Sequence, residues 1–160
     1  MVDLLSKLST YNLFNYLFPG IIFVILASKF TQYNFMQQDI FTGAFLYYFI
    51  GLVVSRFGSL VIEPLLKRIS YLQFADYNDF IAASKNDEKI ELLSEVNNTY
   101  RTLSSLFILL LLLKLCAWVE CRYPVLAEWN AMILVLLLVI FLLSYRKQTN
   151  YVTKRIKANR

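Results

Sequence analysis

The 160-residue sequence contains no histidine, only two cysteines, four glycines and three prolines. Without histidine, a metal site built on imidazole and a nucleophile–histidine catalytic pair are both excluded. Two cysteines argue against a metal site built on thiolates, and the four glycines form no glycine-rich phosphate-binding loop. We therefore expect no cofactor, no metal and no enzymatic activity.

Charge is also scarce, because only 17% of the residues are charged whereas soluble domains carry about a quarter. Hydrophobic residues make up 58% of the chain, and its mean hydropathy is +0.53. This composition excludes a disordered chain, a collagen-like chain and a secreted domain held by disulfides. The apolar residues form uninterrupted blocks, which is typical of an integral membrane protein.

Four of these blocks, at about residues 13–28, 40–62, 103–119 and 129–145, have the length of transmembrane segments. Only a helix satisfies its own backbone hydrogen bonds in lipid as a single segment. The predicted fold is therefore all-α, with two membrane hairpins (1–62 and 102–145), a helical cytoplasmic segment (63–101) and a basic cytoplasmic tail (146–160).

Prolines leave two details of these helices open. The Pro19-Gly20 pair interrupts the first block, which is either a kinked span or an interfacial helix followed by a short insertion. The Glu63-Pro64 pair is expected to mark a kink or the end of the second helix, because proline lacks a backbone donor.

The distribution of lysine and arginine predicts the orientation. With four spans, twelve of these residues fall on the side of both termini and the central segment, against Lys29 and Arg122 on the other side. If the first block only lies at the interface, the count is eleven against three, and the later spans keep their direction. Positive residues mark the cytoplasmic side, so a multi-pass protein with both termini in the cytoplasm is predicted.

The central segment carries two helix-start signals. Asp76 with Asp79 has the spacing of an N-terminal cap, and Asn86-Asp87-Glu88 places acids where a helix dipole favours them. From Asp87 the chain has no proline or glycine until Pro124. One helix of about 33 residues, roughly 50 Å long, is therefore predicted to run from the cytoplasm through the third span.

An apolar stripe at helical spacing follows this second start, comprising Ile90, Leu93, Val96, Tyr100 and Leu103. Such a stripe needs an apolar partner. Our preferred interpretation is packing against residues 71–83 of the same segment; the alternatives are a seam between subunits and a docking face for a soluble protein. For the last alternative, the candidate partner-binding residues are the acids Asp87, Glu88, Glu91 and Glu95.

Two charges fall inside the predicted spans. For Lys114 we favour snorkelling of the long side chain to the interface. For Arg56, snorkelling and a specific role are equally supported, because Glu63 follows it by two helical turns and small residues surround it. The candidate residues for a subunit interface or a pore lining are Arg56, Gly51, Gly58, Ser59 and Glu63.

The tail has six bases and no acid, whereas the central segment has seven acids against five bases. The two segments are expected on the same side and are able to attract each other. The tail also suits anionic lipid headgroups, with Arg146, Lys147, Lys154, Arg155 and Lys157 as the candidate contacts. Direct contact with nucleic acid is not expected, since no aromatic platform or recognition motif accompanies the charge.

The whole layout resembles the small membrane subunits of bacterial antiphage defence loci, and the four-span subunit of the Kiwa system is the nearest type. The stretches 55–65 (SRFGSLVIEPL) and 94–101 (SEVNNTYR) carry the most family-like character. Neither matches a motif of known role, so no functional residue is carried over. The resemblance implies a homo-oligomer in the bacterial inner membrane that senses phage-induced perturbation or permeabilises the membrane, with a cytoplasmic effector attached.

Three functions are therefore compared. The first is an oligomeric sensor or scaffold that binds a soluble cytoplasmic partner through residues 63–101. The second is an oligomeric ion channel or permeabilising effector, in which Arg56 would favour anions. The third is an accessory subunit of a larger membrane complex.

Overall fold

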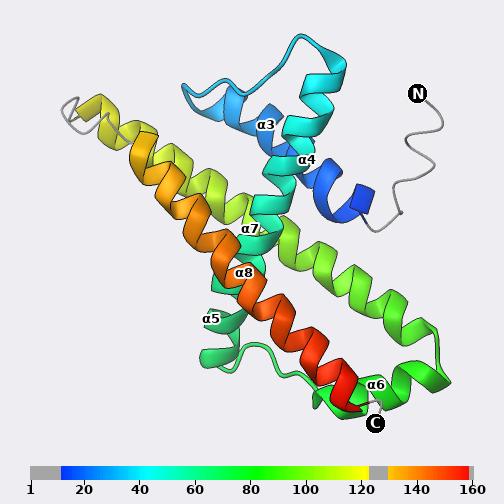
Figure 1. The fold of residues 1–160 in the computed structure, drawn as a ribbon. Helices are drawn as coiled ribbons and strands as arrows, with labels where there is room; N and C mark the ends of the chain where they lie inside the picture. The colour runs from blue at the N-terminus through cyan, green and yellow to red at the C-terminus, as the bar shows by residue number, and fades with distance from the viewer. Residues whose placement is uncertain (1–11, 123–129, 159–160) are drawn as a thin grey trace.

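The computed structural model describes residues 12–122 and 130–158, which form helices and short connections with no strand among them (Figure 1). In chain order the elements are η1 (Leu13–Leu17), α3 (Phe18–Phe30), α4 (Ile40–Phe57), η2 (Gly58–Ile62), α5 (Glu63–Arg68), α6 (Tyr77–Asn86), α7 (Lys89–Arg122) and α8 (Asn130–Ala158). Four helical runs, 13–30, 40–68, 89–122 and 132–158, are long and apolar enough to cross a membrane. The predicted all-helical fold with four apolar helices is confirmed, and it supports a multi-pass membrane protein.

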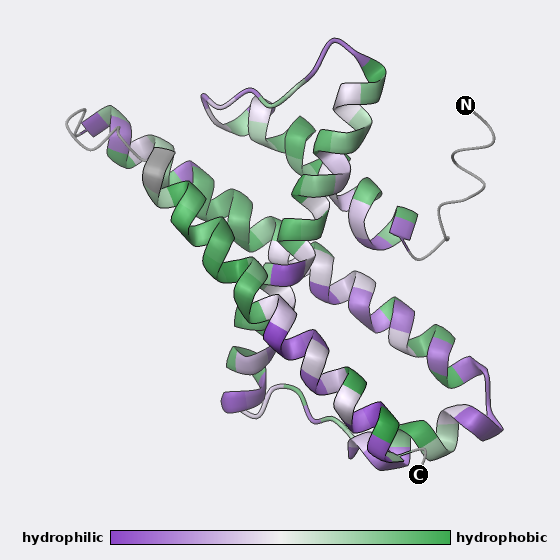
Figure 2. Cartoon of the chain, viewed as in Figure 1, coloured by the Kyte–Doolittle hydropathy of each residue, from purple (hydrophilic) through white to green (hydrophobic). Residues whose placement is uncertain are grey.

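Two hairpins of helices pack across each other. Helices α3 and α4 form the first hairpin, α7 and α8 form the second, and α4 crosses both helices of the second (Figure 1). Helices α7 and α8 are hydrophobic toward the ends that face the 122–130 connection and hydrophilic toward their other ends (Figure 2). The hydrophilic ends lie with α5 and α6, and we call this part of the molecule, residues 63–101 and 146–158, the α6 end.

Both prolines of the first hairpin lie inside continuous helices. Pro19 and Pro64 each follow a π-helical turn, η1 and η2, by two residues. Proline lacks the N–H that would bond to the preceding turn, and its ring would clash there. A locally wider turn accommodates both effects, which is why such turns accompany irregularities in membrane helices. Of the two alternatives for Glu63-Pro64, the end of the second helix is wrong, because the helix continues through Pro64 to Arg68.

That helix ends at Arg68, four residues after Pro64, at a reversal of the backbone. Ser70 has a positive φ of 59°, its N–H donates to Lys67 O at 3.0 Å, and Tyr71 N–H donates to Leu66 O at 3.0 Å. These two bonds form a Schellman motif, with serine in the left-handed position that glycine usually occupies. The end of the helix is thus set by capping bonds and not by the proline.

The predicted long helix is confirmed as α7, which has 34 residues and spans roughly 50 Å. Both predicted helix starts are also present. The Asp76 carboxylate accepts from Asn78 N–H at 2.8 Å before α6, and the Asp87 carboxylate accepts from Lys89 N–H at 2.9 Å before α7. The absence of proline and glycine after Asp87 therefore predicted the length of α7 correctly.

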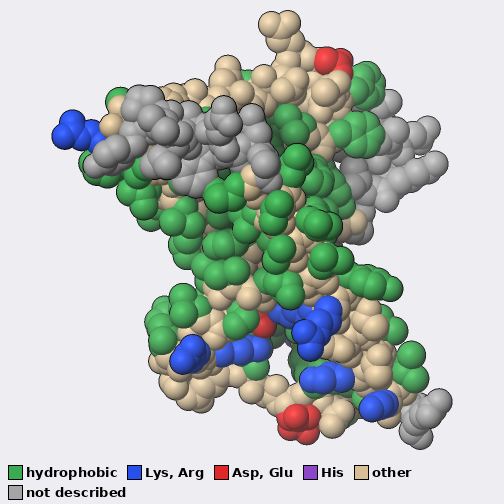
Figure 3. Space-filling model, turned by 60° about the vertical axis from the view of Figure 1, so that its left-hand side comes forward, with side chains coloured by type: hydrophobic (Ala, Val, Ile, Leu, Met, Phe, Trp, Pro, Cys, Tyr) green, Lys and Arg blue, Asp and Glu red, His purple; other side chains and the backbone are tan. Residues whose placement is uncertain are grey.

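The buried core is small and lies where α3, α4 and α7 meet. Val24, Val54 and Leu106 are almost fully buried there, whereas most large apolar side chains of α8 are exposed, among them Leu134 and Leu138. Hydrophobic side chains cover the middle of the molecule, and Lys and Arg side chains gather below them (Figure 3). An apolar exterior with charge at one end is the pattern expected of helices surrounded by lipid.

Candidate functional site

The most unusual site is a buried carboxylate shared by three cations. Glu63, at the start of α5, has a side chain that is only 9% exposed. Its Oε2 accepts from Arg101 Nη1 at 2.8 Å, and its Oε1 lies 3.1 Å from Lys67 Nζ and 3.8 Å from Lys147 Nζ. The cations come from α5, α7 and α8, so one carboxylate joins three helices that are far apart in the sequence. We call Glu63, Lys67, Arg101 and Lys147 the Glu63 cluster.

Small residues make room for this cluster. Lys147 Nζ also donates to Ser59 O at 2.6 Å and to Ser59 Oγ at 3.0 Å, which links α8 to η2. A Cβ atom on Gly58 would collide with Ser105 Oγ and would lie 3.3 Å from Arg101 Cγ. Because Gly58 has no side chain, α7 approaches η2 closely enough for Arg101 to reach the carboxylate.

A second polar group lies deeper, between α7 and the first hairpin. Thr102 Oγ1 donates to Asn15 Oδ1 at 2.8 Å, and it lies 3.2 Å from Ser55 Oγ and 2.9 Å from Asn98 O. Asn15, Ser55 and Thr102 are all buried. Asn15 also has a buried Nδ2 with no hydrogen-bond partner among the described residues. Buried polar atoms of this kind join helices specifically, because an unmatched partner is costly in an apolar interior.

We expect Thr102→Val to destabilise the chain by roughly 1 kcal/mol, because it leaves Asn15 Oδ1 buried without this donor. The matched control is Thr99→Val on the same helix, since the Thr99 hydroxyl bonds only to its own helix, at Glu95 O. Thermal unfolding in detergent is the measurement. Equal shifts for the two variants would show that the bond between helices contributes nothing.

The structure changes the interpretation of the candidate interface residues on α4 and η2. Gly51, Gly58, Ser59 and Glu63 are all buried against helices of the same chain, so their small-residue face serves packing within the molecule. A subunit interface or a pore lining at these four residues is not supported, because the chain itself covers them. Arg56 is half-buried and forms no ion pair with Glu63 or with any other described residue.

The preferred interpretation of the α7 stripe is wrong for most of its members. Leu93, Val96 and Tyr100 are 65%, 42% and 66% exposed, and only Ile90 and Leu103 are half-buried. Helix α6 packs against α7 and its Ile81 is buried, but Leu93, Val96 and Tyr100 remain exposed. The candidate partner-binding acids are all exposed, namely Asp87, Glu88, Glu91 and Glu95.

The basic tail is the second half of α8, which continues as one helix to Ala158. The predicted attraction between the central segment and the tail is confirmed at Lys147 and Glu63, and the rings of Tyr77 and Tyr151 add a contact at 6.3 Å. Of the candidate lipid contacts, Lys147 is turned inward to the cluster. The others are exposed, namely Arg146, Lys154, Arg155 and Lys157.

No protein-family model, no curated protein and no solved structure matches this chain. Among the residues that the structure describes, no group of three metal-ligating side chains comes together. The contacts, burial and charges of the chain's own residues therefore indicate what it binds.

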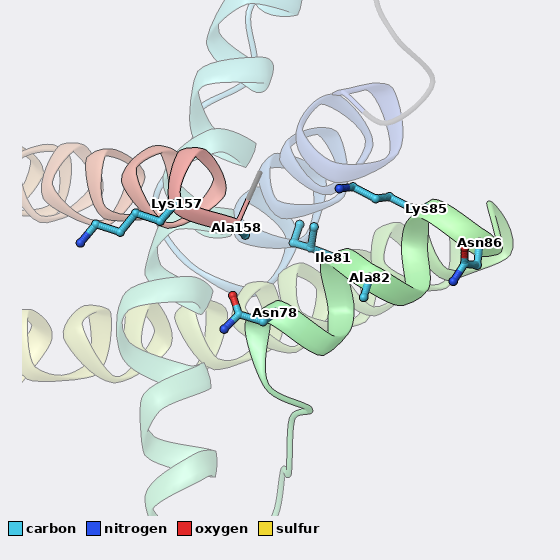
Figure 4. A pocket seen from close by; sticks show the side chains of 7 residues that line it. All are labelled: Asn78, Ile81, Ala82, Lys85, Asn86, Lys157 and Ala158. Carbon is cyan, nitrogen blue, oxygen red and sulfur yellow. The ribbon is translucent and has the colours of Figure 1, made fainter. Parts of the chain in front are cut away.

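An open cleft of about 560 Å³ lies between α6 and the end of α8. Figure 4 shows its lining, which comprises Asn78, Ile81, Ala82, Lys85 and Asn86 along α6, and Lys157 and Ala158 at the end of α8. The lining holds two cations and two amides but no carboxylate. The cleft is shallow and adds a positively charged recess to the α6 end.

At the opposite end of the molecule, a small polar contact joins the first hairpin to α7. Gln32 Nε2 donates to Glu120 Oε2 at 2.8 Å, which ties the connection after α3 to the last turns of α7. Burial, together with the hydrogen bond and charge of Glu120, raises the pKa of Tyr33 to about 12. Lys114, three quarters of the way along α7, is exposed on the same half of the helix. This end has little charge and no site comparable to the Glu63 cluster among the described residues.

Proposed function

We propose that this protein is a membrane-embedded scaffold or sensor whose α6 end lies in the cytoplasm and binds a soluble protein. The observation that carries the proposal is the exposed apolar face on residues 89–101 of α7. Leu92, Leu93, Val96 and Tyr100 are exposed there by 61%, 65%, 42% and 66%, in a part of the helix that lies beyond the apolar span. Large apolar side chains gathered on a surface that faces water usually mark a contact with another protein.

The charge beside this face indicates the chemistry of the partner. Glu91 and Glu95 are exposed on the same helical segment, Glu88 is exposed directly before it, and none of the three forms an ion pair with a described residue. Charged rims around an apolar centre steer the encounter and select partners of opposite charge. The proposed partner therefore presents an apolar groove or helix with basic residues around it.

The packing of the α6 end supports a link between this face and the membrane helices. Ile81 of α6 is buried at 3% exposure, and Arg101 at the end of the face is held by Glu63 inside the bundle. A partner that pulls on residues 89–101 therefore acts on the same continuous helix that crosses the membrane. This connection is the physical basis for a sensor in which the state of the spans and the bound partner affect each other.

The setting that we propose is the bacterial inner membrane, with both termini in the cytoplasm, because lysine and arginine concentrate at the α6 end. Antiphage defence and assembly into a homo-oligomer are proposed from the resemblance to the four-span Kiwa subunit. We prefer the scaffold to a channel because the small-residue face that a pore would need is already covered within the chain.

The test is affinity purification of the intact chain in mild detergent, with mass spectrometry of the proteins that co-purify. We expect a stoichiometric soluble partner, and we expect its capture to fall at least tenfold in the double variant Leu93→Asp/Val96→Asp. The matched control is Val152→Asp/Ile156→Asp, which changes two apolar residues of similar exposure on α8. A partner that is lost equally from both variants, or no partner at all, would contradict docking at the α7 face.

A further inference from the structure

We propose that residues 65–74 form a surface that contacts the phospholipid headgroups of the membrane leaflet next to the α6 end. These residues comprise the end of α5 and most of the connection to α6, and we call them the α5 patch. The proposal rests on the placement of the four helical runs in a membrane. It does not depend on a protein partner, because the α5 patch and the exposed face of α7 share no residue.

The first observation is that large apolar side chains gather on this short segment and remain exposed. The exposed fractions are 54% for Leu65, 63% for Ile69, 75% for Tyr71 and 49% for Phe74. Large apolar side chains that are exposed together usually mark a contact surface. The α5 patch therefore needs a partner that the chain itself does not supply among its described residues.

Two contacts hold the connection against the end of α5. Tyr71 N–H donates to Leu66 O at 3.0 Å in the reversal at Ser70, and Lys67 Nζ lies 3.9 Å from the centre of the Phe74 ring. Phe74, which follows the reversal, is thereby placed beside the helix that precedes it. The α5 patch is thus one surface built from both sides of the turn.

The charge of the α5 patch favours a phospholipid surface as its partner. Residues 64–75 contain two cations, Lys67 and Arg68, and no acid. Lys67 pairs with Glu63, whereas Arg68 is exposed and forms no ion pair with a described residue. The guanidinium of Arg68 is therefore available to lipid phosphates, which attract basic residues near the membrane surface. The exposed ring of Tyr71 also suits the headgroup level, where amphipathic rings are enriched.

The α5 patch also continues the exposed surface of a helix that is able to cross the membrane. The helical run 40–68 passes without a break through η2 into α5, beyond the crossing of α4 with α8 (Figure 1). Val61 is 43% exposed, and it lies one turn before Leu65 on the same helical face. Exposed apolar surface thus runs from the span into the α5 patch, which places the α5 patch at the boundary between acyl chains and headgroups.

Lipid contact at this surface is linked to the Glu63 cluster through one side chain. Lys67 contacts the Phe74 ring and pairs with Glu63 at 3.1 Å. The same carboxylate binds cations of α7 and α8. A change in the membrane surface that moves the α5 patch would therefore reach the point where these helices are joined.

The test is the fluorescence of a single tryptophan in the purified full chain, reconstituted in vesicles of phosphatidylglycerol and phosphatidylcholine. The two native tryptophans, Trp118 and Trp129, are replaced by phenylalanine, and Tyr71→Trp introduces the probe. We expect blue-shifted emission that is quenched when the phosphatidylcholine carries bromine on its acyl chains, since an interfacial ring lies within their reach.

The comparison variant is Leu92→Trp in the same background, because Leu92 is 61% exposed on the α7 face. Its tryptophan should not be quenched. No quenching in Tyr71→Trp would refute the proposal, and blue-shifted emission without quenching would show that protein covers the α5 patch instead of lipid. Equal quenching in both variants also refutes it, because the whole α6 end would then lie against the lipid.

A charge change tests whether the α5 patch itself makes the contact. Ile69→Asp, added to the Tyr71→Trp chain, should remove most of the quenching, because lipid phosphates repel a carboxylate and an exposed apolar side chain is lost. The control is Asn78→Asp, which adds the same charge at an exposed position of α6 and should leave the quenching unchanged. If both changes reduce the quenching equally, or if neither does, the contact is not made by the α5 patch.

Discussion

Glu63→Gln is expected to lower the stability of the chain by about 3 kcal/mol or more, the typical loss when one partner of a buried ion pair is removed. The amide keeps the size of the side chain but no longer balances the charges of Arg101 and Lys147, which stay close to each other in a partly buried position. At 2–4 °C per kcal/mol for chains of this size, the unfolding temperature in detergent should fall by roughly 10 °C.

The exposed carboxylate of Glu95 offers the control, because Glu95→Gln removes the same charge from α7 where no ion pair with a described residue is lost. A second variant separates charge balance from general damage. In Glu63→Leu/Lys147→Met an apolar pair replaces the carboxylate and one cation, and part of the lost stability should return. A double variant that is worse than the sum of the single changes would contradict the ion-pair explanation.

Local patterns in the sequence were sufficient to predict most of the helices. The length of α7 follows from the absence of proline and glycine after Asp87, and the start of α6 follows from the capping carboxylate of Asp76. The sequence patterns did not predict where the second helix ends, because proline normally ends or kinks a helix. The π-helical turn η2, which lets the helix pass Pro64, has no established sequence signal.

The partners of Glu63 were missed for a different reason. Spacing along one helix suggested Arg56, whereas the carboxylate binds Arg101 and Lys147, which are 38 and 84 residues further along the chain. Such pairings depend on how the two hairpins cross, and the spacing of residues along one helix does not predict that crossing. The interpretation of the α7 stripe was wrong for the same reason. The spacing of its residues shows that the helix has an apolar face, but it does not show whether α6 is positioned to cover that face.

The close packing of α3 against α4 within the first hairpin depends on two glycines, and these give the last prediction. A Cβ atom on Gly20 would collide with the carbonyl oxygen of Tyr47, and a Cβ atom on Gly51 would collide with the carbonyl oxygen of Tyr16. In both cases the obstacle is backbone of the neighbouring helix, which is unable to rotate away as a side chain does. Either alanine must therefore push α3 and α4 apart.

Two effects of each glycine-to-alanine change oppose each other. Alanine favours a helix over glycine by up to about 1 kcal/mol. Forcing atoms into a packed contact costs typically 1–3 kcal/mol, and moving a whole helix also weakens neighbouring contacts such as the Tyr16–Tyr48 ring pair at 5.5 Å. We therefore expect Gly20→Ala and Gly51→Ala each to lose about 2 kcal/mol in thermal unfolding.

Gly43 provides the internal comparison within the same hairpin. A Cβ atom there would meet only the ring of Tyr47, at 3.3 Å, and a side chain can shift by a few tenths of an ångström at little cost. The helix preference of alanine then dominates, so Gly43→Ala should be neutral or slightly stabilising. If all three variants unfold at the same temperature, close approach of the helix backbones is not what holds α3 against α4 in the first hairpin.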